Sequence, residues 1–130
     1  MSDEPVLFGF YVPPPPQPLL SPDGNDGYAQ LRAAFDTARQ RIDESDADII
    51  LVYSTTWPSI VGHQIQAHPE PEWTHVDDDF HFLGSMPYKF RMDVDFANGY
   101  KAAADARGLH ARTVAYHGFP IDTGSVVALS

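Results

Sequence analysis

Asp48-Ile-Ile-Leu-Val-Tyr-Ser-Thr-Thr-Trp57-Pro58 decides the fold class of this chain, because a continuous apolar run ends there in three hydroxyl groups and a tryptophan. Such a run is typical of a strand that is buried on both faces of a parallel sheet. In α/β sheets the ligand crevice lies outside the carboxyl ends of the strands. We therefore expect residues 54–57 to lie where a site would be built.

Two other segments repeat this arrangement. Residues 6–12 are apolar and run into four consecutive prolines at 13–16, and residues 113–117 run through Gly118-Phe-Pro-Ile into Asp122-Thr-Gly124. The carboxyl ends of parallel strands meet at one edge of a sheet. Three strand ends are therefore expected to converge.

Two helices separate the predicted strands. Turn and cap residues at 23–27 precede apolar residues at helical spacing from Leu31 to about Ser45. A second apolar stripe runs from Met92 to Ala103 and ends near Gly108. With a third strand at about 111–117, the order of elements predicts an α/β fold with a parallel or mostly parallel central sheet flanked by helices.

Three segments depart from this alternation. The prolines at 13–18 predict a loop of polyproline II character, because proline lacks an amide hydrogen and has a fixed φ. Residues from about 58 to 90 read as a long irregular insertion, of the kind that forms lids, binding loops or assembly surfaces. The apolar end at 125–130 reads as an exposed edge that a partner chain would cover.

Composition limits the function classes. The 130 residues fit one domain, and 43% hydrophobic residues can fill a core. Eight basic and eighteen acidic side chains give a net charge of −10, which disfavours binding to nucleic acid and to anionic membrane surfaces. There is no cysteine, no signal peptide at the acidic start and no apolar stretch of bilayer length, so a cytoplasmic location is expected.

The three strand ends resemble the motifs of the LigB-like superfamily of class III extradiol ring-cleavage dioxygenases. In that family the first strand ends in a Val-Pro-His-Pro-Pro-like turn, the second in Ser-x-His-Trp, and a third segment carries Asp-His-Gly. This chain has Val12-Pro-Pro-Pro-Pro16, Ser54-Thr-Thr-Trp57 and Asp122-Thr-Gly124 in the same order. The resemblance covers residues 1–130 as a single LigB-like α/β domain, equivalent to the N-terminal half of a usual family member.

Each histidine of the family pattern is replaced. Pro14 and Thr56 occupy the positions of the two iron-binding imidazoles, and Thr123 occupies that of the active-site histidine. Proline has no side-chain donor atom, and a neutral hydroxyl is a poor ligand for Fe(II), which prefers two histidines and a carboxylate in such enzymes. The resemblance therefore implies vestigial positions here, no cofactor in this chain, and Fe(II) in a catalytic partner.

Other residues leave open alternatives. Tyr11, Trp57 and Phe119 could line an aromatic-binding cleft with His117 and Asp122, or belong to the core and to ordinary turns. The acidic insertion contains four histidines that could instead form a separate metal site: His63, His68, His75 and His81. Their spacing matches no metal-binding template.

The leading hypothesis is a non-catalytic structural or regulatory subunit that pairs with a metal-binding, LigB-like catalytic chain in a hetero-oligomer. The alternative is a small divergent metal-dependent enzyme of the same superfamily, a dioxygenase-like oxidoreductase that acts on an aromatic substrate. A third hypothesis is a module that binds a small aromatic molecule without turning it over.

Overall fold

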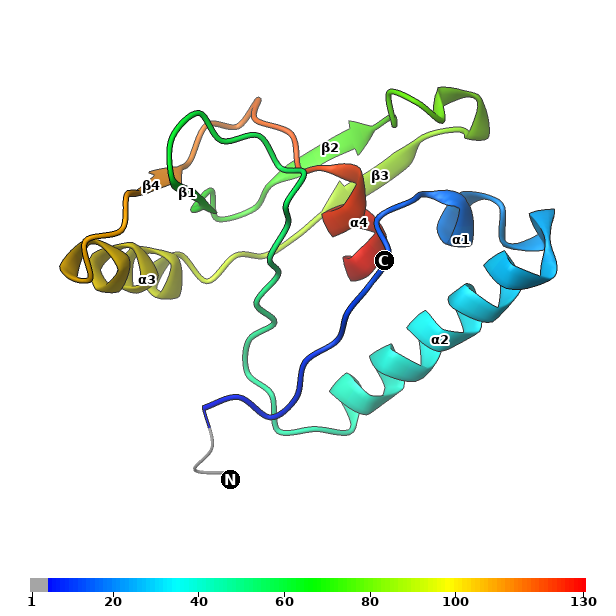
Figure 1. The fold of residues 1–130 in the computed structure, drawn as a ribbon, viewed down its shortest axis with the longest axis horizontal. Helices are drawn as coiled ribbons and strands as arrows, with labels where there is room; N and C mark the ends of the chain where they lie inside the picture. Colours follow the sequence, from blue (N-terminus) through cyan, green and yellow to red (C-terminus); the bar gives the residue numbers. More distant parts are fainter. Residues whose placement is uncertain (1–4) are drawn as a thin grey trace. The chain divides into compact units, whose positions relative to one another are not determined.

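The computed structural model describes residues 5–130, and the acidic start, for which the sequence predicts no signal peptide, lies largely outside these residues. The described chain is a mixed α/β structure (Figure 1). Its elements are α1 (Gln17–Leu20), η1 (Pro22–Gly24), α2 (Asp26–Asp43), β1 (His63–Gln66), β2 (Glu72–His75), η2 (His81–Leu83), β3 (Met86–Lys89), α3 (Val94–Ala106), β4 (Ala111–Val114) and α4 (Thr123–Leu129).

The chain divides into two compact units. The first contains the described residues up to Tyr53, together with Val76–Gly84 and Thr123–Ser130, and therefore holds α1, α2 and α4. The second contains Ser54–His75 and Ser85–Asp122, and therefore holds all four strands and α3. The α/β fold class is confirmed, with a small parallel pair, an antiparallel pair and accompanying helices.

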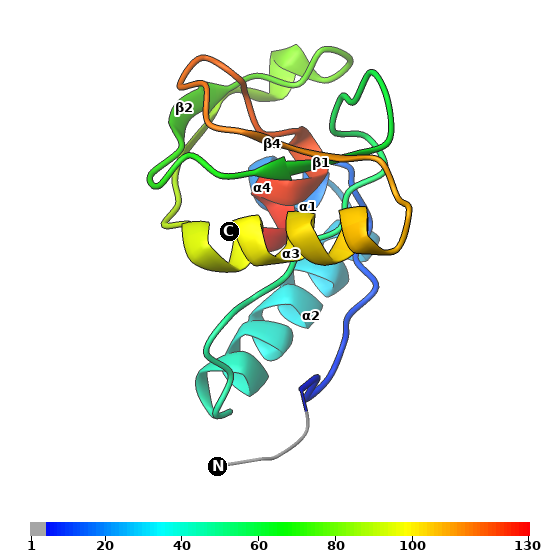
Figure 2. The same cartoon turned by 90° about the vertical axis from the view of Figure 1, so that its left-hand side faces the viewer.

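The parallel pair of the second unit joins β1 to β4, with His63 opposite Ala111 and Gln66 opposite Val114. Figure 2 shows the two strands together, and α3 packs against both of them. Ala97 and Ala104 are the buried residues of α3, seven positions apart and therefore on one face of the helix. Such small side chains let the helix approach the strands closely.

The boundaries of α3 follow from its caps. The Asp93 side chain accepts a hydrogen bond from the Phe96 amide at 2.8 Å, as an N-cap does. At the other end Gly108 has φ +74°, and the amides of Gly108 and Leu109 donate to the carbonyls of Asp105 and Ala104. This is a Schellman motif, so the predicted end of the helix near Gly108 is confirmed.

Gly62 sets the entry into β1. Its φ is +70°, and a Cβ atom built on it would lie 2.3 Å from the carbonyl oxygen of His110. That carbonyl accepts the His63 amide at 2.7 Å, as the first bond of the parallel pair. Glycine is therefore required at position 62 for both its conformation and its size.

The antiparallel pair joins β2 to β3, with Trp73 opposite Tyr88 and His75 opposite Met86. Met86 and Tyr88 are buried, whereas Trp73 is about half exposed. Both strands lie inside the segment from 58 to 90 that reads as an irregular insertion. That segment is therefore more ordered than its proline-rich sequence indicates.

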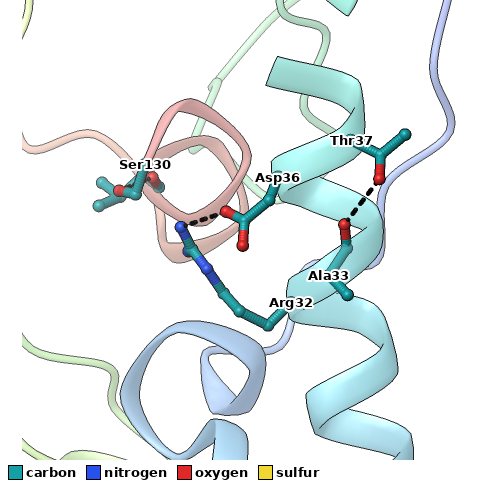
Figure 3. A network of polar contacts seen from close by, with 6 residues as sticks. Arg32, Ala33, Asp36, Thr37 and Ser130 are labelled. Atoms are coloured by element: carbon teal, nitrogen blue, oxygen red, sulfur yellow. Dashed lines mark hydrogen bonds and ion pairs between the residues drawn. The ribbon is translucent and has the colours of Figure 1, made fainter. Parts of the chain in front are cut away.

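In the first unit α2 is the longest helix and confirms the predicted helix after the 23–27 turn. The Asn25 side chain accepts the Tyr28 amide at 2.9 Å, as an N-cap. Arg32 pairs with Asp36 at 3.0 Å, and the Thr37 hydroxyl donates to the Ala33 carbonyl at 3.0 Å (Figure 3). These local contacts lie one helical turn apart and support the helix modestly.

The predicted strands at 6–12 and 48–53 are wrong in the described structure. Both segments are extended traces without strand pairing (Figure 1). Ile50 and Leu51 are 54% and 53% exposed, so the run is not buried either. An apolar run becomes a strand only when a neighbour accepts and donates its backbone hydrogen bonds, and the described chain offers none to residues 48–52.

The prediction of an exposed apolar edge at 125–130 is also wrong. Residues Thr123–Leu129 form α4, and Val126 and Val127 are almost completely buried. The Ser130 hydroxyl donates to the Val126 carbonyl at 2.5 Å and ties down the last turn. Burial of the valines outweighs their preference for strands.

The proline run is partly helical. Pro16 is the N-cap of α1, and Pro18 lies in the first turn, where a missing amide hydrogen breaks no helical bond. Residues 13–15 remain an irregular loop, as predicted. In residues 5–130 no helix combines the length and apolar character needed to cross a bilayer.

Candidate functional site

Two of the three predicted strand ends meet around the carboxylate of Asp122 in the second unit. The hydroxyls of Ser54 and Thr56 donate to Oδ2 of Asp122 at 2.7 and 2.8 Å. Ser54 Oγ in turn accepts the backbone amides of Thr56 and Trp57 at 3.2 and 3.3 Å. We call Ser54, Thr56 and Asp122 the Asp122 cluster.

Aromatic contacts join the same two segments. Trp57 Nε1 donates to the carbonyl of Pro120 at 2.8 Å. The Trp57 ring meets the Phe119 ring edge to face, with centroids 5.4 Å apart and planes at 88°. Both aromatic side chains are half-buried, so they pack on each other more than they line an open cleft.

Ile121, the residue before Asp122, is held in place by a residue of β3. The amide of Ile121 donates to the Tyr88 hydroxyl at 3.0 Å, and both residues are buried. The β3 strand therefore positions the residue immediately before Asp122. Tyr88 could not be singled out from the sequence, because a lone aromatic residue in a segment without regular periodicity carries no positional signal.

His117 lies near a second histidine. Its ring centroid is 5.4 Å from that of His68, with planes at 50°. Nδ1 of His68 accepts the Glu70 amide at 3.1 Å, so in the neutral ring the hydrogen lies on Nε2, which is then a hydrogen-bond donor. This pair was not predicted, since 49 residues of sequence separate its members.

The other insertion histidines lie in separate elements. His63 begins β1 and His75 ends β2, while His81 begins η2 and its ring packs against Phe82. Among residues 5–130, no three His, Asp or Glu side chains gather in a group that could hold a metal ion. Among the described residues the insertion therefore contributes one imidazole, that of His68, to the His68 and His117 pair.

Three of the sequence-predicted positions, Tyr11, Pro14 and Thr123, lie in the first unit. Tyr11 is fully exposed there, and Pro14 is exposed in the proline loop. Thr123, at the start of α4, donates its hydroxyl to Oδ2 of Asp77 at 2.5 Å. Oδ1 of Asp77 accepts the amides of Asp79 and Phe80, so this carboxylate organises the loop before η2.

The side chains at positions 14, 56 and 123, where the resemblance implies histidines, do not fit Fe(II). Pro14 offers no donor atom, and the hydroxyls of Thr56 and Thr123 are already directed at the carboxylates of Asp122 and Asp77. Non-heme Fe(II) oxygenases use two imidazoles and a carboxylate. Thr56 and Thr123 therefore serve as hydrogen-bond donors within the fold.

A shallow hollow of about 460 Å³ lies apart from these positions, on the β2 and β3 pair. Its rim includes the half-exposed Trp73 and the ion pair of Glu72 with Lys89, at 3.7 Å. Both charged side chains are well exposed, so the pair contributes little to stability. The hollow is lined by Glu72, Trp73, Thr74, Pro87, Tyr88 and Lys89.

The chain is similar to both subunits of one kind of enzyme. It is 33% identical over 123 residues to a 2-aminophenol 1,6-dioxygenase alpha subunit from Pseudomonas sp, covering 95% of this chain and 45% of that protein. It is 28% identical over 136 residues to the corresponding beta subunit from Pseudomonas sp, covering 99% of this chain and 45% of that protein. No protein-family model matches the sequence.

These similarities agree with the resemblance of the motifs to ring-cleaving dioxygenases of the LigB-like type. The chain spans about half the length of the curated relatives it matches. The match extends over nearly the whole chain, so it includes both the Asp122 cluster and the proline loop.

Proposed function

We propose that this chain is a non-catalytic structural or regulatory subunit of a LigB-like extradiol dioxygenase-type complex, and that it pairs with a metal-binding catalytic chain. The observation that carries the proposal is that the hydroxyls of Thr56 and Thr123 are both used in hydrogen bonds. Each of these residues occupies a position where the family has a histidine, and each donates its hydroxyl to a carboxylate of the fold.

The similarity to both an alpha and a beta subunit supports the pairing. The names of these relatives describe an enzyme with two kinds of subunit that acts on 2-aminophenol. By this proposal the chain shares the pairing behaviour of such subunits. By this proposal the Fe(II) and the ring-cleaving chemistry belong to the partner, and this chain stabilises or regulates it.

Copurification tests the proposal. The tagged chain, isolated from its native host, is expected to bring with it a second chain with histidines at the positions equivalent to Pro14 and Thr56. Iron measured in that complex should scale with the amount of the second chain. A stable monomer that cleaves 2-aminophenol or a catechol by itself would contradict the proposal.

The alternative function is a small divergent metal-dependent enzyme acting on an aromatic substrate, and the His68 and His117 pair is the observation that favours it. Two imidazoles with ring centroids 5.4 Å apart would share an ion if the His68 ring gave up its hydrogen bond from the Glu70 amide, so that a nitrogen lone pair faced the ion. Elemental analysis distinguishes the two functions. The alternative requires stoichiometric metal that is lost in His68→Ala and His117→Ala but kept in His63→Ala.

A small aromatic ligand is compatible with either function. Trp57 and Phe119 would supply the apolar contact, and Asp122 and His117 the polar groups that orient a ring hydroxyl or amine. Binding of catechol or 2-aminophenol should then quench Trp57 fluorescence, while Trp57→Phe abolishes the signal and Trp73 serves as the internal reference.

A further inference from the structure

A buried side-chain amide lies at the carboxyl end of β1 with one of its two polar atoms unpartnered. Gln66, the last residue of the strand, is 8% exposed, and its Oε1 atom accepts the His68 amide at 2.9 Å. Its Nε2 atom is buried and has no hydrogen-bond partner among the described residues. Folded proteins rarely leave a buried donor unsatisfied, because such a group loses its bonds to water and gains none.

The orientation of the Gln66 amide follows from its neighbour. A backbone amide can only donate, so the oxygen of Gln66 must face the His68 amide, and Nε2 is the terminal atom that remains. The missing partner is therefore an acceptor. Gln64, in the same strand, is different, because its Nε2 donates to the Pro58 carbonyl at 2.7 Å.

Two imidazole rings lie beyond the same end of the parallel pair. His68 follows β1 and is half-buried, whereas His117 follows β4 and is exposed. Gln66 is paired with Val114 in the register of the two strands, and the ring centroids of the two histidines are 5.4 Å apart. In α/β folds the crevice outside the carboxyl ends of parallel strands is where ligands bind. All of these residues belong to the second unit.

His68 contributes a second donor at this strand end. Its Nδ1 atom accepts the Glu70 amide at 3.1 Å, so the hydrogen of the neutral ring lies on Nε2. The Nε2 atoms of Gln66 and His68 both present hydrogens. Donors of this kind attract the oxygens of an anion and repel a metal cation.

The charge of the second unit is compatible with an anion. This unit contains five basic and six acidic side chains, so most of the net charge of −10 belongs to the first unit. The acid nearest in sequence to the two donors is Glu70. Its side chain is exposed, so water and salt screen its charge.

We infer that the carboxyl ends of β1 and β4 form a binding site for a small carboxylate, with Gln66 Nε2 and His68 Nε2 as the donors and His117 beside them. The two oxygens of a carboxylate can accept several hydrogen bonds, and such bonds are stronger than those between neutral groups. This inference goes beyond the proposed function, and it holds whether or not the chain pairs with a catalytic subunit.

A nuclear magnetic resonance titration of the whole ¹⁵N-labelled chain with acetate at constant ionic strength tests the site. We expect the resonances of the Gln66 side-chain amide and of His68 Nε2 to shift together and to saturate. Acetamide has the same shape without the charge, so it should cause smaller shifts at the same concentrations. This measurement on the native chain needs no variant to fold.

Two substitutions remove one donor each. Gln66→Met keeps the length of the side chain, and His68→Phe keeps a ring beside His117. Each should weaken acetate binding by roughly tenfold, since a hydrogen bond to a charged group is lost. Gln64→Met is the matched control, because the donor of Gln64 is already bound to the Pro58 carbonyl, and its acetate affinity should be unchanged. The backbone amide spectrum of each variant reports whether it folds.

Each outcome of the titration decides for or against the site. Saturable shifts at Gln66 and His68 that weaken in both donor variants and persist in Gln64→Met support it. The absence of saturable shifts at these two residues overturns it, as does acetate binding that neither donor variant weakens. Saturation by inorganic phosphate without a response to acetate overturns the choice of a carboxylate. A response to Zn(II) alone, with loss of the bond between the Glu70 amide and His68, overturns the anion site in favour of a metal.

Discussion

Thr56 and Asp122 are joined by a hydrogen bond of 2.8 Å although 66 residues of sequence separate them. The proposed function takes Thr56 to stand where LigB-like dioxygenases have an iron-binding histidine, and Asp122 to begin their third motif. In this chain the two residues connect two loops of the second unit, with Ser54 bound to the same carboxylate oxygen. A position expected to bind metal therefore contributes to stability.

Removal of the Asp122 carboxylate should destabilise the fold. Asp122→Ala leaves the hydroxyls of half-buried Ser54 and exposed Thr56 without their acceptor, and we expect the free energy of unfolding to fall by about 1–2 kcal/mol. Urea denaturation followed by tryptophan fluorescence measures the change. Thr55→Ala is the control, because Thr55 is exposed and lies between the two bonded residues. Equal effects of the two substitutions would contradict a stabilising role for the cluster.

Gly62 should be intolerant of any side chain. In Gly62→Ala the new Cβ would meet the His110 carbonyl, and the residue would keep a left-handed conformation that costs about 1–2 kcal/mol even without a clash. We expect a loss of more than about 2 kcal/mol in stability. The measurement is the thermal midpoint by circular dichroism.

Gly99→Ala serves as the matched control for this substitution. Gly99 lies inside α3, and a Cβ there meets nothing within 4 Å. Alanine is the better helix former by up to about 1 kcal/mol, so the variant should be equal to or more stable than the native chain. Similar losses at positions 62 and 99 would show that the entry into β1 is not constrained as the structure indicates.

The hydrogen bond from Thr123 to Asp77 should stabilise the first unit. Thr123→Val keeps the shape of the side chain but removes the donor, and we expect a loss of about 1 kcal/mol. Thr123→Ser keeps the hydroxyl and should lose less. Hydrogen exchange at the amides of Asp79 and Phe80, both bound by Asp77, should rise in Thr123→Val only.

The helices were predictable from the sequence because their signals are local. Asn25 and Asp93 cap α2 and α3, and Gly108 ends α3 through its positive φ. Cap and periodicity signals operate within a few residues, so no knowledge of the tertiary fold is needed to recognise them.

The strands were less predictable because each depends on a partner distant in sequence. β1 and β2 are short and polar, with the sequences HQIQ and EWTH, and only their pairing with β4 and β3 identifies them. The apolar run at 48–53 carries the strongest strand signal, and it forms no strand in the described structure. The valines of α4 suggested an exposed strand edge, but they are buried in a helix. Tertiary contacts, which the local sequence does not reveal, decide this.

The candidate site was predictable in part. The meeting of residues 54–57 with the segment that ends at Asp122 follows from the repeated pattern of apolar run and polar end. The role of Asp77 could not be foreseen. Nothing in the sequence of an acidic loop indicates which of its carboxylates will accept a hydrogen bond from a threonine 46 residues later. The pairing of His68 with His117 is equally a product of the folded chain.

Iron analysis of the chain, alone and in complex, tests the central claim most directly. The account predicts background iron in the purified chain after incubation with Fe(II) under anaerobic conditions. In the complex isolated from the native host, it predicts iron in proportion to the second chain. Stoichiometric iron in the isolated chain, with turnover of an aromatic substrate, would contradict the account.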